Sequence, residues 1–229
     1  MKRIPLVLLL VATCAAMTAS FAFAASDEEV AQQAKKLTEG TAVYHELIQA
    51  PDKAVPKELL ERCKCIAVLP GVVKAAIGYG ARHGSGVMTC RTAKGWSAPA
   101  FVNISGGSVG FQLGAESSDL VLFFMSDRGA RSLVNGSRIT LGGKASVAAG
   151  PFGRSGEAAT NLELKAEIYS YARSKGLFAG LSIEGARLAP NATDIKRYYG
   201  KGMTYQKLLF GAGPSHMPGE AAQFLTVLP

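Results

Sequence analysis

The spacing of apolar and polar positions predicts helices in the first quarter of the chain. Ser26-Asp27-Glu28-Glu29 has the form of a capping box, in which the serine hydroxyl and the last carboxylate satisfy free backbone amides at a helix start. Apolar residues then recur at helical spacing as far as Ile48, and Gly40 is expected to separate two amphipathic helices. A short helix is expected to follow Pro56, which suits a first helical turn.

From Cys65 onward the apolar runs shorten to strand length and glycine becomes frequent. The predicted strands are Cys65–Leu69, Gly86–Arg91, Pro99–Ile104, Leu120–Met125 and the alternating run Leu177–Glu184. Short helices are expected at 126–134, 162–174, 191–200, 204–210 and 219–228. Glycines within the strand region are typical of bulges and bends that curl a sheet. The pattern therefore predicts an α+β domain with a strongly curved, mostly antiparallel, barrel-like sheet, short covering helices and N-terminal amphipathic helices.

The N-terminal residues have the three-part layout of a secretory signal peptide. Lys2 and Arg3 precede an apolar run, and small residues end at Ala22-Phe23-Ala24. This layout predicts cleavage after Ala24, with 25–229 as a single domain. A lipoprotein modified at Cys14 is the alternative, although Thr13 is a poor residue to precede a lipidated cysteine. We therefore expect an exported protein, periplasmic or associated with the cell envelope.

The charge balance of the chain narrows the classes of partner. The formal net charge is +8, and removal of Lys2 and Arg3 with the signal peptide lowers it to +6. A basic protein favours anionic lipid, an acidic polymer or nucleic acid as partner, and export makes nucleic acid the least suitable of these. Basic charge that serves solubility alone remains the alternative.

Cysteine positions predict one disulfide bond. Cys63, Cys65 and Cys90 follow the predicted cleavage site, and two of them should pair in an oxidising compartment. Cys63 and Cys65 point to opposite sides of an extended backbone, so one of them faces a neighbouring strand. We expect Cys65 to pair with Cys90 and Cys63 to stay free. A zinc site formed by the three cysteines and His83 is an alternative that lacks a second metal knuckle.

Several segments, in order between Val55 and Gly211, resemble the SYLF family of bacterial exported proteins and eukaryotic adaptor modules. They are Val55-Pro56-Lys57-Glu58-Leu59-Leu60, Cys65-Ile66-Ala67-Val68-Leu69-Pro70-Gly71, Gly84-Ser85-Gly86-Val87, Gly95-Trp96-Ser97-Ala98-Pro99, Gly106–Gly114, Asp119–Met125, Ala149–Arg154, Tyr169–Gly180 and Tyr198-Tyr199-Gly200. The chain is similar to an exported bacterial member, with 55–211 as the best-matching core.

The resemblance implies non-catalytic binding of anionic phospholipid, and some fungal relatives also bundle actin. Lipid contact in the family is associated with the N-terminal amphipathic helix and a basic surface. The matching residues of this chain are Val30, Lys35, Lys36, Leu37, Lys53, Lys57, Arg62 and Lys64. Each Lys or Arg close to an anionic surface contributes about 1 kcal/mol, so a patch of them is needed. For Leu37, packing against the sheet is the alternative.

A second candidate anion site lies in the glycine-rich segment from Gly150 to Gly156. Its backbone amides and the two-pronged Arg154 guanidinium could cradle a phosphate, and a tight structural loop is the alternative.

The sequence offers few candidate catalytic residues. The chain has 3 histidines and none lies in a recognisable nucleophile motif. We therefore expect no enzyme, no catalytic residue, no metal and no cofactor. The alternatives to lipid binding are a secreted or surface module that binds a protein or polysaccharide, and then an uncharacterised hydrolase.

Overall fold

The computed structural model describes residues 4–50, 55–77, 79–109, 114–134, 138–143, 145–151, 166–174, 177–181 and 183–229. The helices are α1 (Ile4–Gln49), α2 (Lys57–Arg62), α3 (Asp127–Ser132), α5 (Ala192–Tyr199), α6 (Tyr205–Phe210) and α7 (Gly219–Thr226). The strands are β1 (Cys65–Ile77), β2 (Tyr79–Thr92), β3 (Gly95–Trp96), β4 (Ala100–Val109), β5 (Gly114–Phe124), β6 (Ile139–Thr140), β7 (Val147–Ala149), β8 (Ile168–Ser174), β9 (Leu177–Gly180) and β10 (Arg187–Pro190).

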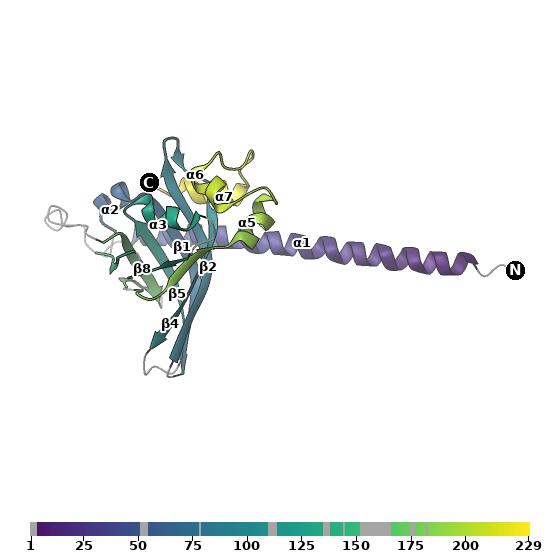
Figure 1. Cartoon of the computed structure of the whole chain (residues 1–229), viewed down its shortest axis with the longest axis horizontal. Coiled ribbons are helices and arrows are strands. Elements are labelled where there is room, and N and C mark those ends of the chain that lie inside the picture. The colour runs from purple at the N-terminus through teal and green to yellow at the C-terminus, as the bar shows by residue number, and fades with distance from the viewer. Residues whose placement is uncertain are drawn as a thin grey trace.

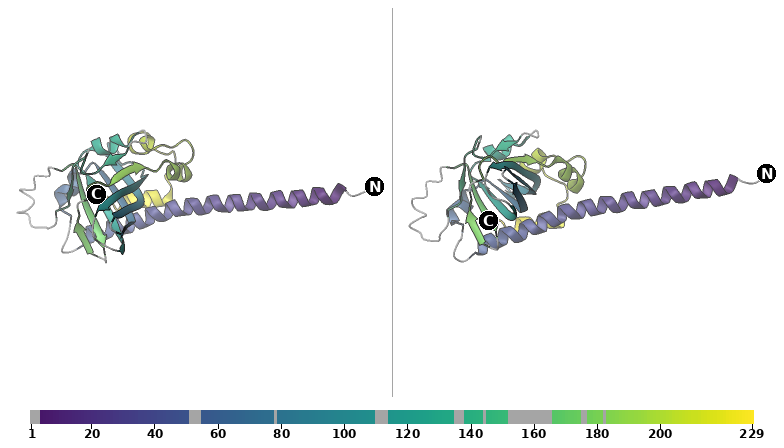
Figure 2. Two further views of the ribbon diagram at one scale, coloured as in Figure 1. Left: turned by 60° about the horizontal axis from the view of Figure 1, so that its bottom comes forward. Right: turned by 90° about the horizontal axis from the view of Figure 1, so that it is seen from below.

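The strands form one curled sheet in the order β6-β10-β4-β2-β1-β5-β8-β7, with β3 on β2 and β9 on β8. Neighbouring strands are antiparallel except for the parallel pair β7 and β8. Figure 2 shows the sheet curling into a half-barrel. The prediction of an α+β domain with a strongly curved, mostly antiparallel sheet and short helices is confirmed.

Helices cover both faces of the sheet. On one face Tyr44 of α1 packs against Phe123 of β5, and their ring centroids lie 6.4 Å apart. On the other face the Tyr205 hydroxyl at the start of α6 donates to the Met88 sulfur of β2 at 3.3 Å. The N-terminal part of α1 extends away from the sheet as a single projecting helix (Figure 1). Among the helices that the structure describes, none combines the length and hydropathy needed to cross a membrane.

A bulge at Pro70-Gly71 bends β1 sharply. The register shifts there relative to both neighbours, and Gly71 has a φ of 59°, a left-handed conformation that favours glycine. The Gly71 N–H donates to Asp119 Oδ1 at 2.8 Å. Across the bend, a Cβ at Gly86 would lie 2.6 Å from the Leu69 Cα, so a side chain there would collide with backbone. Glycine at these positions therefore permits the tight curl of the sheet.

The disulfide prediction is confirmed. Cys65 and Cys90 are bonded and are also directly opposite in the register of β1 and β2. Cys63 is a free, buried thiol, and burial raises its pKa to about 11. The bonded pair is not available for the alternative zinc site.

Two helix predictions are wrong. The helix expected over 162–174 is a strand where the structure describes it, because Ile168–Ser174 forms β8. Residues 168–172 of this strand are all buried, on both faces of the sheet, so the sequence shows no alternation of buried and exposed positions there. The break at Gly40 and the start at Ser26 are absent too, since α1 passes through both positions. Packing on the sheet outweighs the cost of about 1 kcal/mol for glycine inside a helix.

Candidate functional site

The residues predicted to contact lipid fall into separate environments. Leu37 is 0 % exposed and belongs to the hydrophobic core, so in this structure it has no surface to offer a bilayer. Val30 and Lys35 are exposed on α1, whereas the Lys36 ammonium is held 2.7 Å from Asp194 of α5. Lys53 and Arg154, with the candidate loop around Arg154, lie outside the described residues.

Most of the predicted basic surface is internally paired. Lys35 faces Glu39 at 3.7 Å, and on α2 Lys57 faces Glu61 at 3.3 Å. Arg62 likewise lies 2.8 Å from Glu58, and Lys64 is exposed two residues after the end of α2. Exposed pairs of this kind stabilise the fold by only about 0.3–0.5 kcal/mol, but they place carboxylates among the cations. The surface therefore carries much less net positive charge than its lysines and arginine suggest.

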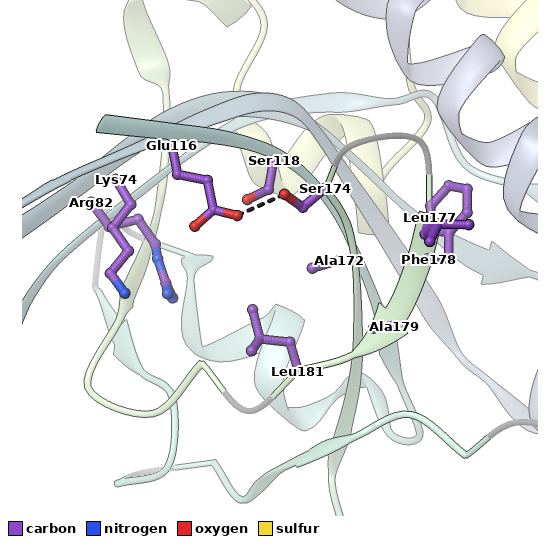
Figure 3. Close-up of a pocket in the computed structure, with 10 residues that line it drawn as sticks. All are labelled: Lys74, Arg82, Glu116, Ser118, Ala172, Ser174, Leu177, Phe178, Ala179 and Leu181. Atoms are coloured by element: carbon purple, nitrogen blue, oxygen red, sulfur yellow. Dashed lines mark hydrogen bonds between the residues drawn. The ribbon is translucent and has the colours of Figure 1, made fainter. Parts of the chain in front are cut away.

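A pocket of about 380 Å³ lies beneath the curled sheet, on the far side of the β1 bulge from the disulfide. Lys74, Arg82 and Glu116 line it from β1, β2 and β5, and β8 and β9 close it on the other side. Figure 3 shows the charged side chains pointing into this space, with Leu181 opposite them. Its volume falls within the usual range for small-molecule sites, about 300–1,000 Å³.

Strand register brings the three charges into one row. Lys74 lies directly opposite Arg82 on one side and directly opposite Glu116 on the other. Directly opposite residues of antiparallel strands share a face and have Cβ atoms about 5 Å apart. The row therefore carries two cations and one anion, a net charge of +1.

A hydrogen bond holds Glu116, the anion of this row, in position. The two cations have no such partner in the described structure. Ser174 of β8 donates its hydroxyl to Glu116 Oε1 at 2.6 Å. Lys74 and Arg82 form no ion pair or hydrogen bond with the residues that the structure describes. Partial burial lowers the pKa of Arg82, and the Glu116 carboxylate opposes this effect. Arginine stays protonated at neutral pH, so an incoming anion would replace hydration that this guanidinium has lost.

The other wall of the pocket is apolar and accessible. Leu177 is 66 % exposed and Leu181 is 40 % exposed. Behind them Phe178 is buried, with the Arg173 guanidinium 5.5 Å from its ring centroid. Arg173 is neutralised by Asp119 and Glu46, so it holds β9 in place without adding net charge to the pocket. The pocket thus joins two cations that have no partner in the described structure to an exposed apolar rim.

Comparison with known protein families decides the assignment of the chain. The family model Ysc84, described as "Las17-binding protein actin regulator", matches residues 105–229. The chain belongs to the Ysc84 family. This confirms the resemblance to SYLF proteins drawn from the sequence.

Curated relatives extend the match toward the N-terminus. The human "SH3 domain-containing YSC84-like protein 1" is 36 % identical over 201 residues, which cover 87 % of this chain and 57 % of the relative. "Protein YSC84" of Saccharomyces cerevisiae is 36 % identical over 180 residues, covering 77 % of this chain and 38 % of that protein. "LAS seventeen-binding protein 3" of the same species is 36 % identical over 163 residues, covering 70 % and 35 %. The chain spans less than two thirds of the length of these relatives.

Two features that could indicate a catalytic centre in this Ysc84-family chain are a metal site and a strongly shifted pKa. No group of three His, Cys, Asp or Glu side chains in the described ranges is placed to hold a metal ion. The tyrosines whose pKa is strongly raised owe the shift mainly to burial, and Tyr44 and Tyr205 are core residues. The family description names binding and regulation and no reaction.

Sequence reasoning missed Lys74, Arg82 and Glu116. The predicted strands ended at Leu69 and began at Gly86, whereas β1 and β2 continue well beyond the bulge. The sequence signal for these longer strands is that Lys74 alternates with Ala75, and Arg82 with Ala81 and His83. Successive side chains of a strand point to opposite faces of the sheet. Only the register between strands shows that these three charges meet.

Proposed function

We propose that this chain is a non-catalytic module that binds anionic phospholipid at a membrane surface. The observation that supports this function is the meeting of Lys74 and Arg82, which form no ion pair with any described residue, with the exposed rim of Leu177 and Leu181. The phosphate of a headgroup would lie between the cations, and the apolar rim would contact the start of an acyl chain. The basic residues of α1 and α2 then add long-range attraction and do not form the specific site.

The energies of these contacts are consistent with membrane binding. Two basic groups close to an anionic surface contribute roughly 2 kcal/mol, and burial of two leucine side chains adds roughly 3 kcal/mol. A total of roughly 5 kcal/mol corresponds to a sub-millimolar dissociation constant for one site. The positive net charge of the chain adds long-range attraction, which strengthens binding to a membrane that presents many anionic headgroups.

Export is part of the same proposal. Cleavage after Ala24 would leave α1 to start near the capping-box residues Ser26 and Glu29, and the mature domain would act at the outer side of the cytoplasmic membrane. Intact-mass measurement of the protein recovered from its native compartment tests this cleavage. A mass that retains residues 1–24 would contradict it.

Vesicle binding tests the proposed site. Lys74→Gln/Arg82→Gln should weaken binding to phosphatidylglycerol-containing vesicles by about tenfold to thirtyfold, because two contributions of about 1 kcal/mol are lost. Lys35→Gln/Lys57→Gln removes the same formal charge from paired surface positions and should weaken binding less than about threefold. Co-sedimentation of the full chain at fixed salt, with circular dichroism to verify folding, measures both.

The outcomes separate the two surfaces. A larger loss in Lys35→Gln/Lys57→Gln than in the pocket variant would assign lipid contact to the helical surface and overturn the pocket. If the wild-type protein does not bind acidic vesicles even at low ionic strength, the proposal of lipid binding itself is wrong.

A protein partner is the second candidate, since relatives are named for binding Las17. The exposed Leu177 and Leu181 on and after strand β9 are the observation that favours it. Immobilised chain should then retain purified Las17, and Leu177→Ser/Leu181→Ser should abolish retention. Equal retention by this variant and the wild type would exclude the leucine rim as the contact.

A further inference from the structure

The pocket contains a negative charge that an anion-binding site does not need. Glu116 stands in the same row as Lys74 and Arg82, directly opposite Lys74 in the pairing of β1 with β5. Directly opposite residues have Cβ atoms about 5 Å apart, so the Glu116 carboxylate repels an anionic ligand that binds Lys74. Its presence therefore affects which anions the site accepts.

The structure holds this carboxylate within the pocket. Ser174 of β8 donates to Glu116 Oε1 at 2.6 Å, so Glu116 is tied to the neighbouring strand. Figure 3 shows this hydrogen bond crossing from β5 to β8 beside Ser118. Neither Lys74 nor Arg82 forms an ion pair with Glu116 in the described structure, so both cations stay available while the negative charge stays in place.

We infer that Glu116 is a specificity-determining residue, which restricts the pocket to singly charged phosphodiester headgroups and disfavours doubly charged phosphate monoesters. The inference rests on the proposed lipid-binding function. With Lys74 and Arg82 opposed by Glu116, the row has a net charge of +1. A phosphodiester carries one negative charge and matches it. A phosphate monoester, whose second pKa is about 6, carries nearly two at neutral pH and meets additional repulsion from Glu116.

The neighbouring charges that the structure describes do not compensate for this excess. Arg173, the next cation on β8, is paired with Asp119 and Glu46. It also faces Phe178, which lies behind the exposed leucine rim. The second negative charge of a monoester therefore finds no further free cation among the described residues that line the pocket.

The test compares two lipids and two matched variants. Full-length wild type, Glu116→Gln and Glu61→Gln are titrated with vesicles that contain phosphatidylglycerol, a diester, or phosphatidate, a monoester, at matched vesicle surface charge. Glu116→Gln keeps an oxygen that accepts the Ser174 hydrogen bond. Glu61→Gln removes the same charge from α2, where Glu61 pairs with Lys57 outside the pocket.

Wild type should prefer the diester vesicles. Glu116→Gln should shift the ratio of the two affinities toward the monoester by roughly threefold to tenfold, the effect of one partly screened charge at this range. Glu61→Gln should leave the ratio unchanged. Soluble glycerol phosphate and glycerophosphoglycerol, which lack acyl chains, serve as competitors that distinguish a free phosphate ligand from a lipid headgroup.

The possible failures are distinguishable. If wild type binds neither vesicle, the proposed function fails. If wild type binds both and Glu116→Gln changes the two affinities by the same factor, the function stands and the role of Glu116 is wrong. Displacement of vesicles by millimolar glycerol phosphate more readily than by glycerophosphoglycerol would also overturn the diester preference.

Discussion

Phe123→Ala should lower the free energy of unfolding by about 3 to 5 kcal/mol, the usual cost of removing a buried aromatic ring. Phe123 is 0 % exposed and lies near the C-terminal end of β5. Its ring centroid lies 6.4 Å from that of Tyr44 on α1 and 5.6 Å from that of Tyr171 on β8. The substitution therefore opens a cavity where the N-terminal helix, a central strand and the edge region of the sheet meet. Urea unfolding followed by circular dichroism measures the change.

Leu177→Ala is the matched control for this prediction. Leu177 is also a large apolar residue, but it is 66 % exposed, so its truncation should change the free energy of unfolding by less than about 0.5 kcal/mol. A loss below about 1 kcal/mol in Phe123→Ala would show that α1 and the sheet do not share one packed core.

Reduction of the disulfide should lower the melting temperature by about 7 to 14 °C. Cys65 and Cys90 are 25 residues apart, and a closed loop of this length restricts the unfolded chain by about 3.5 kcal/mol. For a domain of this size, each kcal/mol corresponds to about 2–4 °C in melting temperature. Differential scanning calorimetry with and without a reductant measures the shift.

Two variants control for other effects of the reductant. Cys65→Ser/Cys90→Ser should melt near the reduced wild type and show no response to reductant. Cys63→Ser should keep the full response, because the Cys63 thiol is free and its pKa of about 11 leaves it protonated and unreactive at neutral pH. A reductant shift in the double variant equal to that of the wild type would show that the crosslink does not stabilise the fold.

The helices that end the chain were predictable because their signals are local. Asn191 accepts from the Asp194 amide and Thr204 accepts from the Lys207 amide, as expected for residues that cap α5 and α6. The strand expected over 120–125 was also recovered as the buried end of β5. The Cys65–Cys90 bond followed from strand alternation, another short-range rule. The capped helices and the strand depend on residues within a few positions of one another, and the choice of Cys65 over Cys63 depended only on strand alternation.

The misassigned strand β8 and the uninterrupted α1 depend on distant residues. Ile168 and Tyr171 share a helical face by spacing, yet β8 is buried between β5 and the short strands β7 and β9. Gly40 ends no helix because it lies against Val87 of β2 and Phe224 of α7. In both segments, packing energy from partners far along the chain exceeds the local preference.

The sequence by itself determined the family, the basic charge, the one crosslink and the curled α+β architecture, because these rest on composition, short motifs and local periodicity. Only the tertiary structure decided which charges are available to a ligand. It paired Lys36 of α1 with Asp194 of α5. It also brought Lys74, Arg82 and Glu116 together from three strands. Charge–charge energy depends on distance in space, and strand register sets that distance.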